Sequence, residues 1–218
     1  MKTGIALFII TFLWFDTYPG KDNASTWELK KDKNGIQIYA RNAPGWEYQE
    51  LKVTMQLESS LSGLVAALKD VPSYPEWVYT CTDAYFYKNS PHEEYYYTKF
   101  KAPWPVKSRD LIVHSVIEQD SITKTVIFKG KGLPQYRPMS DGIVRIPAFD
   151  GKYLLVPKGA DMVDVTYIVK LDPGGWLPPW LVNLVSTSGP YNSFVKLRDF
   201  VKRDKYQKAS LAYIDELQ

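Results

Sequence analysis

The feature of this sequence that most constrains its fold is a change of hydrophobic period near residue 175. From Met162 to Leu171, apolar and polar side chains alternate, which is typical of a strand with one buried face. After the turn signal Asp172-Pro173-Gly174-Gly175, apolar residues from Leu177 to Val201 recur at the helical period of about 3.6. The sequence therefore predicts a sheet followed by one long amphipathic helix, which must bury its apolar stripe against that sheet.

The chain before residue 162 is also predicted to be mostly strand. Asn34-Gly35 separates two short strand-like runs and is a strong hairpin signal. The run from Leu51 to Glu58 alternates apolar and polar residues and predicts a half-buried strand. Further strands, separated by Asn, Pro, Gly and Asp, are predicted at Cys81–Tyr87, Glu93–Lys101, Leu111–Glu118, Thr123–Lys129, Gly142–Ile146 and Lys152–Val156.

Helical signals are confined to two places. Ser59 or Ser60 is placed to cap a short helix whose apolar stripe ends at Leu68. In the C-terminal helix, Gly189-Pro190 interrupts the pattern, because proline lacks a backbone donor and clashes with the preceding turn. We expect a kink or two abutting helices at that point, and a polar, frayed chain beyond Arg203.

The order of these elements predicts an α+β fold, a curved antiparallel sheet with its helices gathered on one side. At 218 residues, the chain suits one domain of ordinary size plus an N-terminal appendage. A long helix laid across a strongly curved sheet leaves a space between the two. Large apolar side chains either fill this space as an ordinary core or fall short and leave a ligand cavity, and the sequence alone leaves both alternatives open.

The charge pattern argues against a nucleic-acid-binding face. The 27 basic and 24 acidic residues are interspersed, so the net charge of +3 gives no sustained field that could hold a phosphate backbone. Cys81 is the single cysteine, so no intramolecular disulfide can stabilise the fold. We expect Cys81 to be a small buried apolar residue, and the protein to be a monomer that depends on its core.

The first 25 residues carry a candidate signal peptide. Lys2 supplies a basic start, and the run from Ile5 to Phe15 is almost wholly apolar. This run is shorter than the roughly 20 residues of a membrane-spanning helix, which favours export. We expect a periplasmic or secreted protein if the segment is cleaved and a membrane-tethered protein if it is not. The predicted organisation is a signal peptide or anchor at 1–25, the folded domain at 26–206 and a polar tail at 207–218.

Three segments resemble the START lipid-binding domains in order and spacing. They are Tyr74-Pro75-Glu76-Trp77-Val78, Ala102-Pro103-Trp104-Pro105-Val106-Lys107-Ser108-Arg109-Asp110 and Asp172-Pro173-Gly174-Gly175-Trp176-Leu177-Pro178-Pro179-Trp180-Leu181-Val182-Asn183. The resemblance covers residues 27–204 and implies a helix-grip fold with a tunnel for a sterol, phospholipid or comparable hydrophobe. It implies that the C-terminal helix and adjoining loops close this tunnel. The function it indicates is lipid binding, extended to lipid transfer and transient contact with a membrane.

Aromatic residues, 15% of the chain, supply candidates for the wall of such a cavity. A tyrosine combines an apolar body with a polar hydroxyl, which suits an amphiphilic ligand, although plain core packing is the alternative for each ring. Arg109 offers a fork of donors to a polar ligand head, but Arg109 and Asp110 point to opposite faces of a strand, so at most one faces the cavity. For both, an ordinary ion pair is the alternative. The expected ligand-binding residues are Tyr95, Tyr97, Phe100, Trp104, Arg109, Phe128, Tyr136, Tyr167, Trp180, Leu181, Leu184 and Val185, with Tyr85, Phe86 and Tyr96 as further candidates.

The sequence contains no recognisable catalytic motif. His92 lies in a predicted loop and His114 in a predicted strand, neither with a partner at metal-ligand spacing. We therefore expect no enzyme activity, no catalytic residue, no metal and no cofactor. Two alternatives stay open. One is a helix-grip enzyme of the polyketide cyclase or aromatase type, which uses scattered cavity residues; the other is a protein-interaction module whose apolar groove, near Trp176, takes a protein segment.

Overall fold

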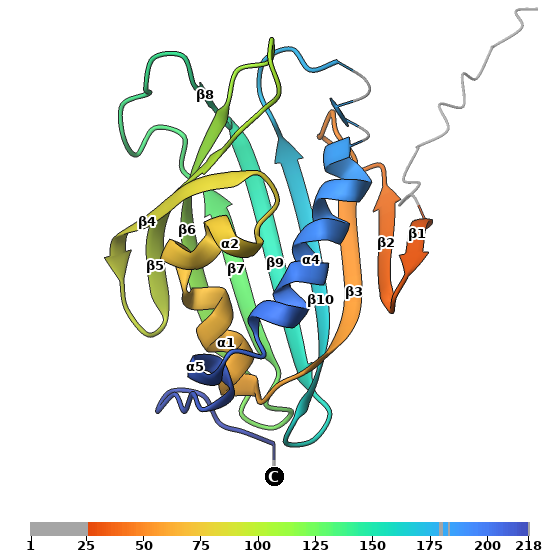
Figure 1. Cartoon of the computed structure of the whole chain (residues 1–218), viewed down its shortest axis with the longest axis vertical. Coiled ribbons are helices and arrows are strands. Elements are labelled where there is room, and N and C mark those ends of the chain that lie inside the picture. The colour runs from red at the N-terminus through yellow and green to blue at the C-terminus, as the bar shows by residue number, and fades with distance from the viewer. Residues whose placement is uncertain (1–25, 179–180, 183, 218) are drawn as a thin grey trace, which may run out of the picture.

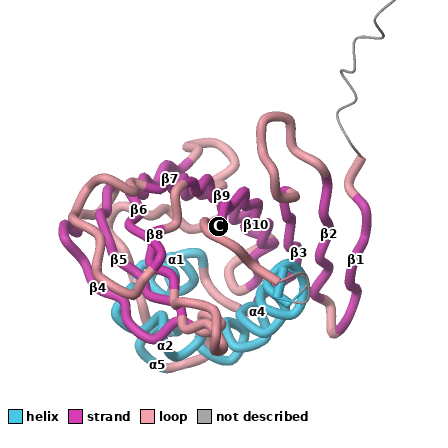
Figure 2. The backbone as a smooth tube through the Cα atoms, turned by 90° about the horizontal axis from the view of Figure 1, so that it is seen from above, coloured by secondary structure: helices cyan, strands magenta, loops and turns pink. Residues whose placement is uncertain are grey.

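The protein folds as one strongly curved sheet that wraps partway around its helices (Figure 1, Figure 2). The computed structural model describes residues 26–178, 181–182 and 184–217. Within these residues the sheet has ten strands, with β1-β2-β3-β10-β9-β7-β6-β5-β4 side by side in antiparallel pairs and the short β8 in parallel with β6. The strands are β1 (Glu28–Lys33), β2 (Ile36–Arg41), β3 (Glu50–Glu58), β4 (Cys81–Asn89), β5 (Glu93–Phe100), β6 (Arg109–Gln119), β7 (Val126–Gly132), β8 (Val144–Arg145), β9 (Ala148–Pro157) and β10 (Met162–Asp172).

The helices lie on the concave side of the sheet (Figure 2). Ser60 caps the first of them as expected, because its hydroxyl accepts a hydrogen bond from the backbone N–H of Gly63 at 3.0 Å. The expected α+β helix-grip architecture is confirmed. The helices are α1 (Leu61–Lys69), α2 (Tyr74–Trp77), α4 (Gly189–Phe200) and α5 (Asp204–Gln207), with a 3₁₀ turn at Val71–Ser73 and a π-helical turn at Leu184–Ser188.

The first three strands join the sheet through the last one. The predicted hairpin forms at Asn34-Gly35, whose φ angles of 53° and 70° suit the tight turn between β1 and β2. Strand β3 then pairs with β10. Val53 lies opposite Tyr167, although more than one hundred residues separate the two in the sequence. Since β10 also pairs with β9, it connects the N-terminal hairpin to the rest of the sheet.

The main hydrophobic core lies at one end of the sheet (bottom of Figure 1). There, α4 and the residue that follows it bury Phe194, Leu197 and Val201 in a cluster that includes Leu64 of α1 and Val53 of β3. All of these side chains are at most 2% exposed. Tyr191 and Val195 pack against the same cluster, so α4 contacts the core along most of its length.

The C-terminal helical stretch begins a few residues later than the apolar stripe predicts. Residues 177–178 lie in a loop, but Leu181 and Val182 are helical, and the π-helical turn at Leu184–Ser188 continues into the 12 residues of α4. Pro190 lies in the first turn of α4, directly after the π-helical turn. Within the described residues the predicted long helix is therefore present, and it changes from π-helical to α-helical geometry at Gly189-Pro190, where a kink or two abutting helices were expected.

The chain beyond Arg203 is ordered against the core, and the prediction that it frays is wrong. Ile214 is 7% exposed and belongs to the main core. The Glu216 carboxylate accepts hydrogen bonds from the backbone N–H groups of Leu61 and Ser62 at 2.9 and 2.8 Å. A carboxylate is favourable at the N-terminus of a helix, because the unpaired N–H groups there carry partial positive charge. Residues 207–218 are mostly polar, so the sequence pattern did not predict that a few of them anchor the segment to the core.

The predicted signal peptide, residues 1–25, lies outside the described residues. The described chain enters the fold at β1, which is an edge strand of the sheet. Within the described part of the chain, no helix is both long and apolar enough to cross a membrane.

Asp70 ties the end of α1 to the C-terminal region. One of its carboxylate oxygens accepts hydrogen bonds from Ser73 at 3.0 Å and from Lys205 and Tyr206 at 2.7 Å each. Burial alone would raise the pKa of Asp70, but these hydrogen bonds hold it below its usual value. This stabilisation is therefore fully present above the unfolded-state pKa of about 4 and is lost as the pH falls through the lower folded-state pKa.

We predict that Asp70→Asn lowers the free energy of unfolding by about 1–2 kcal/mol at neutral pH, because it weakens three hydrogen bonds to a charged acceptor. Urea unfolding at about pH 7 and about pH 3.5 measures this, and the difference from the unsubstituted protein should shrink at the lower pH. Asp204→Asn is the control, since Asp204 is 86% exposed and its pair with Lys208 should contribute less than about 0.5 kcal/mol. A loss at Asp70 that is independent of pH would contradict the prediction.

Candidate functional site

A cavity of about 1210 Å³ lies between the sheet and the helices. It is partly open at the end where β2 leads to β3, β5 leads to β6 and β10 leads to α4 (top of Figure 1). Tyr48, Pro103 and Leu177 contribute to its wall from these three connections. The other end reaches Leu68 of α1 and Ser115 of β6. Of the two alternatives left by the sequence, a filled core and a cavity, the structure has the cavity.

Several of the residues that line the cavity are small. They are Ala40, Gly130 and Gly151 on the sheet and Gly189 and Ser193 on α4. Gly130 and Gly151 make room for the ring of Phe149, which packs closely over both and itself lines the cavity.

Stacked aromatic rings form the middle of the wall. The rings of Tyr153 and Tyr167 lie 4.3 Å apart, and Phe194 of α4 lies 6.3 and 5.9 Å from them. Burial raises the pKa of both tyrosines, so both hydroxyls stay neutral at physiological pH. The wall in this region is therefore apolar, with neutral hydroxyl groups set into it.

A buried charged pair lies in the wall toward α1. Glu94 is 2% exposed, and one of its oxygens lies 2.9 Å from Lys69 Nζ. Lys69 also donates to the backbone carbonyls of Ser90 at 2.8 Å and Pro91 at 3.0 Å. Burial raises the pKa of Glu94, and the ammonium of Lys69 opposes that rise. An otherwise apolar cavity thus contains a strong hydrogen-bond acceptor.

More polar atoms surround this pair. The Tyr74 hydroxyl donates to the Leu68 carbonyl at 2.7 Å, and its ring meets that of Tyr96 edge to face at 5.9 Å. The indole N–H of Trp77, a residue only 3% exposed, has no hydrogen-bond partner among the described residues. Trp77, Tyr74 and Glu94 thus bring polar groups together in one part of an otherwise apolar wall.

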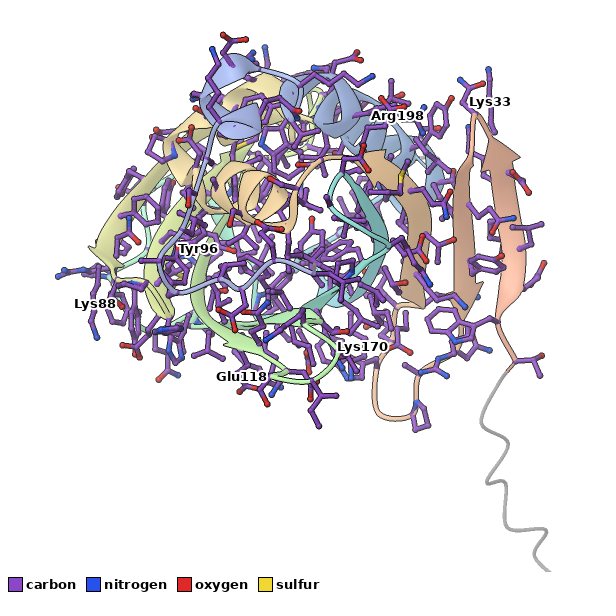
Figure 3. All side chains as sticks on the ribbon, turned by 90° about the horizontal axis from the view of Figure 1, so that it is seen from below. Lys33, Lys88, Tyr96, Glu118, Lys170 and Arg198 are labelled. Atoms are coloured by element: carbon purple, nitrogen blue, oxygen red, sulfur yellow. The ribbon has the colours of Figure 1, made fainter. Side chains whose placement is uncertain are left out.

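The alternation of strand residues decides which predicted side chains reach the cavity. On β5, Glu94, Tyr96 and Thr98 line it, and Tyr96 lies inside the molecule while the exposed Lys88 of β4 projects away from it (Figure 3). On β6, Arg109 lines it, whereas Asp110 faces outward and pairs with Arg145. The expectation that at most one of Arg109 and Asp110 faces the cavity agrees with this geometry.

Five of the predicted ligand-binding residues line the cavity, and four do not. Those that line it are Phe100, Arg109, Phe128, Tyr167 and Leu181. Tyr95 and Tyr97 lie on the opposite face of β5, where Tyr95 stacks on Tyr136 at 5.5 Å and Tyr97 stacks on Tyr85 at 4.8 Å. Trp104 is 92% exposed in the β5–β6 connection. The placement of Tyr95, Tyr97, Trp104 and Tyr136 in the cavity wall is therefore corrected.

Three predictions fall beyond what the structure describes. Trp180 lies outside the described residues, and so do the side chains of Leu184 and Val185. The sequence analysis also missed Glu94, Lys69 and Tyr153, which the structure places in or beside the wall. The signal for Glu94 was present, because it shares the two-residue period of Tyr96 and Thr98.

The chain belongs to the START domain family, whose model matches residues 20–207. It is 30% identical over 184 residues to an uncharacterized protein of Pseudomonas aeruginosa, covering 84% of this chain and 91% of that protein. It is 25% identical over 185 residues to the phosphatidylcholine transfer protein of Bos taurus, covering 83% of this chain and 84% of that protein. The resemblance to START domains found in the sequence is thus confirmed.

A solved structure agrees with this assignment. The STAR-related lipid transfer protein of Xanthomonas axonopodis superimposes with a TM-score of 0.75 at 32% identity, covering 81% of this chain and 99% of that one. Human StAR-related lipid transfer protein 5 gives a TM-score of 0.73 at 14% identity over 84% of this chain and 88% of that one, which supports the fold alone. Among the residues that the structure describes, no group of three or more His, Cys, Asp or Glu side chains is arranged to hold a metal.

We predict that Lys69 and Glu94 are energetically coupled. Lys69→Met or Glu94→Leu alone should cost about 3 kcal/mol of unfolding free energy, because each leaves a buried charge without its partner. The double variant should cost less than the sum of the two by about 1–3 kcal/mol. Guanidinium unfolding of the four proteins gives the coupling directly.

The matched control is the exposed pair of Lys88 and Glu93 in the hairpin of β4 and β5. The same cycle there, Lys88→Met with Glu93→Leu, should give a coupling below about 1 kcal/mol. Simple additivity at Lys69 and Glu94 would show that the buried pair is not a unit.

Proposed function

We propose that the protein binds an amphipathic lipid in this cavity and exchanges it with membranes. The observation that carries the proposal is the cavity itself, about 1210 Å³ with walls of aromatic and aliphatic side chains. This exceeds the roughly 300–1,000 Å³ that drug-sized ligands occupy, and so suits a large hydrophobe. Relatives that include a phosphatidylcholine transfer protein support the same class of ligand.

Burial of hydrocarbon would supply most of the affinity, at about 25 cal/mol per Å² before the costs of association. The few polar groups in the wall would then fix the orientation of the ligand. Glu94 would accept a hydrogen bond from a ligand hydroxyl or amine. Of the predicted residues, Phe100, Phe128, Tyr167 and Leu181 would contact the apolar part of the ligand.

Residues 173–178, which we call the gate segment, would move to admit the ligand. Leu177 lines the cavity from this segment, and Leu181 follows it on the way to α4. Gly174 has a φ of 65° and packs so closely that an added Cβ would lie 2.9 Å from Pro147, so this conformation of the gate segment requires glycine. The gate segment would move from this position to admit the ligand.

Exposed apolar side chains near the gate segment support exchange at a membrane. Trp104, Met139 and Trp176 are 92%, 73% and 74% exposed. They come from three different connections at the top of Figure 1, and two of these, the connections from β5 to β6 and from β10 to α4, also contribute to the cavity wall. Indole rings are favourable at a membrane–water interface. Contact through this end would let the lipid pass between bilayer and cavity without crossing water.

We predict that Val113→Trp abolishes lipid binding. Val113 is 1% exposed and lines the cavity, so the larger side chain takes up ligand space at a cost in stability of about 1–3 kcal/mol. Native mass spectrometry of the protein purified from a lipid-rich host should find a stoichiometric hydrophobic adduct without the substitution and none with it.

Lys131→Trp is the control, because Lys131 lies on the adjoining strand with its side chain 69% exposed on the outer face. It should retain the adduct. If folded Val113→Trp protein still carries the adduct, the ligand binds somewhere other than this cavity. If no variant carries an adduct, even after incubation with sterol and phospholipid panels, the lipid-binding proposal is wrong.

We predict that Trp104→Ala combined with Trp176→Ala slows lipid transfer between vesicles by about tenfold or more, since each indole that enters the membrane contributes about 1.5–3 kcal/mol. A fluorescent phosphatidylcholine moved between donor and acceptor vesicles measures the rate. Ile122→Ala is the control, because Ile122 is 86% exposed at the opposite end (bottom of Figure 1) and should change the rate less than about twofold. Equal effects of both changes would argue against docking through the open end.

A further inference from the structure

Arg109 is a buried cation that faces the cavity without a carboxylate partner. It is 7% exposed, and it lines the cavity wall. Its guanidinium donates to three backbone carbonyls, those of Lys107, Gly174 at 3.3 Å and Trp176 at 3.4 Å. Its Nε atom has no partner, and no ion pair to Arg109 occurs within residues 26–178, 181–182 and 184–217. Burying a charge in this way is costly unless another group compensates it.

Arg145 provides the comparison within the same molecule. It is also 7% exposed, but it faces away from the cavity and holds Asp110 with two hydrogen bonds of 2.7 and 3.0 Å. It donates further to the carbonyls of Pro134 at 2.9 Å and Arg137 at 3.2 Å. Lys69, whose side chain is 11% exposed beside the cavity wall, has Glu94. The fold therefore supplies a carboxylate to each of these two cations and supplies none to Arg109.

We propose that Arg109 binds the acidic group of the ligand, a phosphate or a carboxylate, and that this contact releases the gate segment. The proposal rests on the lipid-binding function above and names the class of lipid: an amphiphile with an anionic head at the gate segment and its apolar part along Tyr153 and Tyr167. A guanidinium matches such a head, because its donors form a planar fork that engages two oxygens at once.

The coupling to the gate segment follows from the same contacts. The Nη2 group of Arg109 donates to both Gly174 and Trp176, at distances longer than the usual N–H···O bond of about 2.9–3.0 Å. An anionic oxygen forms shorter and roughly twice stronger bonds with a guanidinium than a neutral acceptor does. An anionic head would therefore replace the carbonyls of Gly174 and Trp176 as the acceptor of the Nη2 hydrogen bonds, which would free the gate segment. A neutral head would leave these hydrogen bonds, and the gate segment, in place.

Two ligands with the same acyl chain and different heads test the proposal: oleoyl lysophosphatidic acid and monooleoylglycerol. Calorimetric titration of the full chain should find the phosphate-bearing lipid bound at least about tenfold more tightly. Arg109→Gln should remove this preference, by weakening the first ligand about tenfold or more and the second less than about twofold. Lys107→Gln is the control, since it removes an exposed positive charge two residues away and should leave the preference within about twofold.

A second readout reports the gate segment. Hydrogen exchange of the amides from Gly174 to Leu177 should accelerate several-fold when lysophosphatidic acid binds and should not when monooleoylglycerol binds. Arg109→Lys keeps the positive charge but loses the planar fork of donors. Its lipid preference and its exchange rate should both lie between those of the unsubstituted protein and those of Arg109→Gln. If Arg109→Gln does not fold, Arg109→Lys takes its place in the test.

Equal affinity of the unsubstituted protein for both lipids, or an equal loss for both in Arg109→Gln, would overturn the Arg109 inference and leave lipid binding intact. If the unsubstituted protein binds neither lipid nor any member of the sterol and phospholipid panels, the lipid-binding function fails and this inference fails with it. If only neutral lipids of those panels bind, the function stands and the role of Arg109 is wrong.

Discussion

The structure depends on the way one helix is attached to a curved sheet. Phe194, Leu197 and Val201 fix α4 in the core, and Tyr191 and Val195 pack against the same cluster. On the same helix, Gly189 and Ser193 line the cavity with small side chains. The cavity therefore lies beside a helix that the hydrophobic core holds in place.

The polar groups in the cavity divide into those the protein satisfies and those it leaves for another molecule. Glu94 and Lys69 compensate each other, and the Tyr74 hydroxyl has the carbonyl of Leu68. The indole N–H of Trp77 and Nε of Arg109 have no protein partner among the described residues. Leaving a buried donor unpaired costs about 1–3 kcal/mol, so these two groups are the least satisfied polar atoms beside the cavity.

The sequence predicted the fold better than it predicted the site. The two-residue and 3.6-residue periods located the strands and the C-terminal helix, since both are local properties of the chain. Which face of each strand turns inward depends on pairing with distant strands, and a choice that is off by one residue selects Tyr95 and Tyr97 in place of Glu94 and Tyr96. The contacts of Glu216 with α1 and of Lys69 with Glu94 join segments far apart in the sequence, and no local pattern announces them.

The pairing of β3 with β10 has a consequence for the order in which the protein can fold. Strand β3 presents one unsatisfied edge until residues 162–172 have been synthesised, more than one hundred residues later. Helix α1 gains its carboxylate cap only when Glu216 has also left the ribosome. The nascent chain thus carries an unpaired strand edge until β10 has been made. Pairing between strands so far apart in sequence slows folding, and until it forms, the free edge of β3 can pair with another chain.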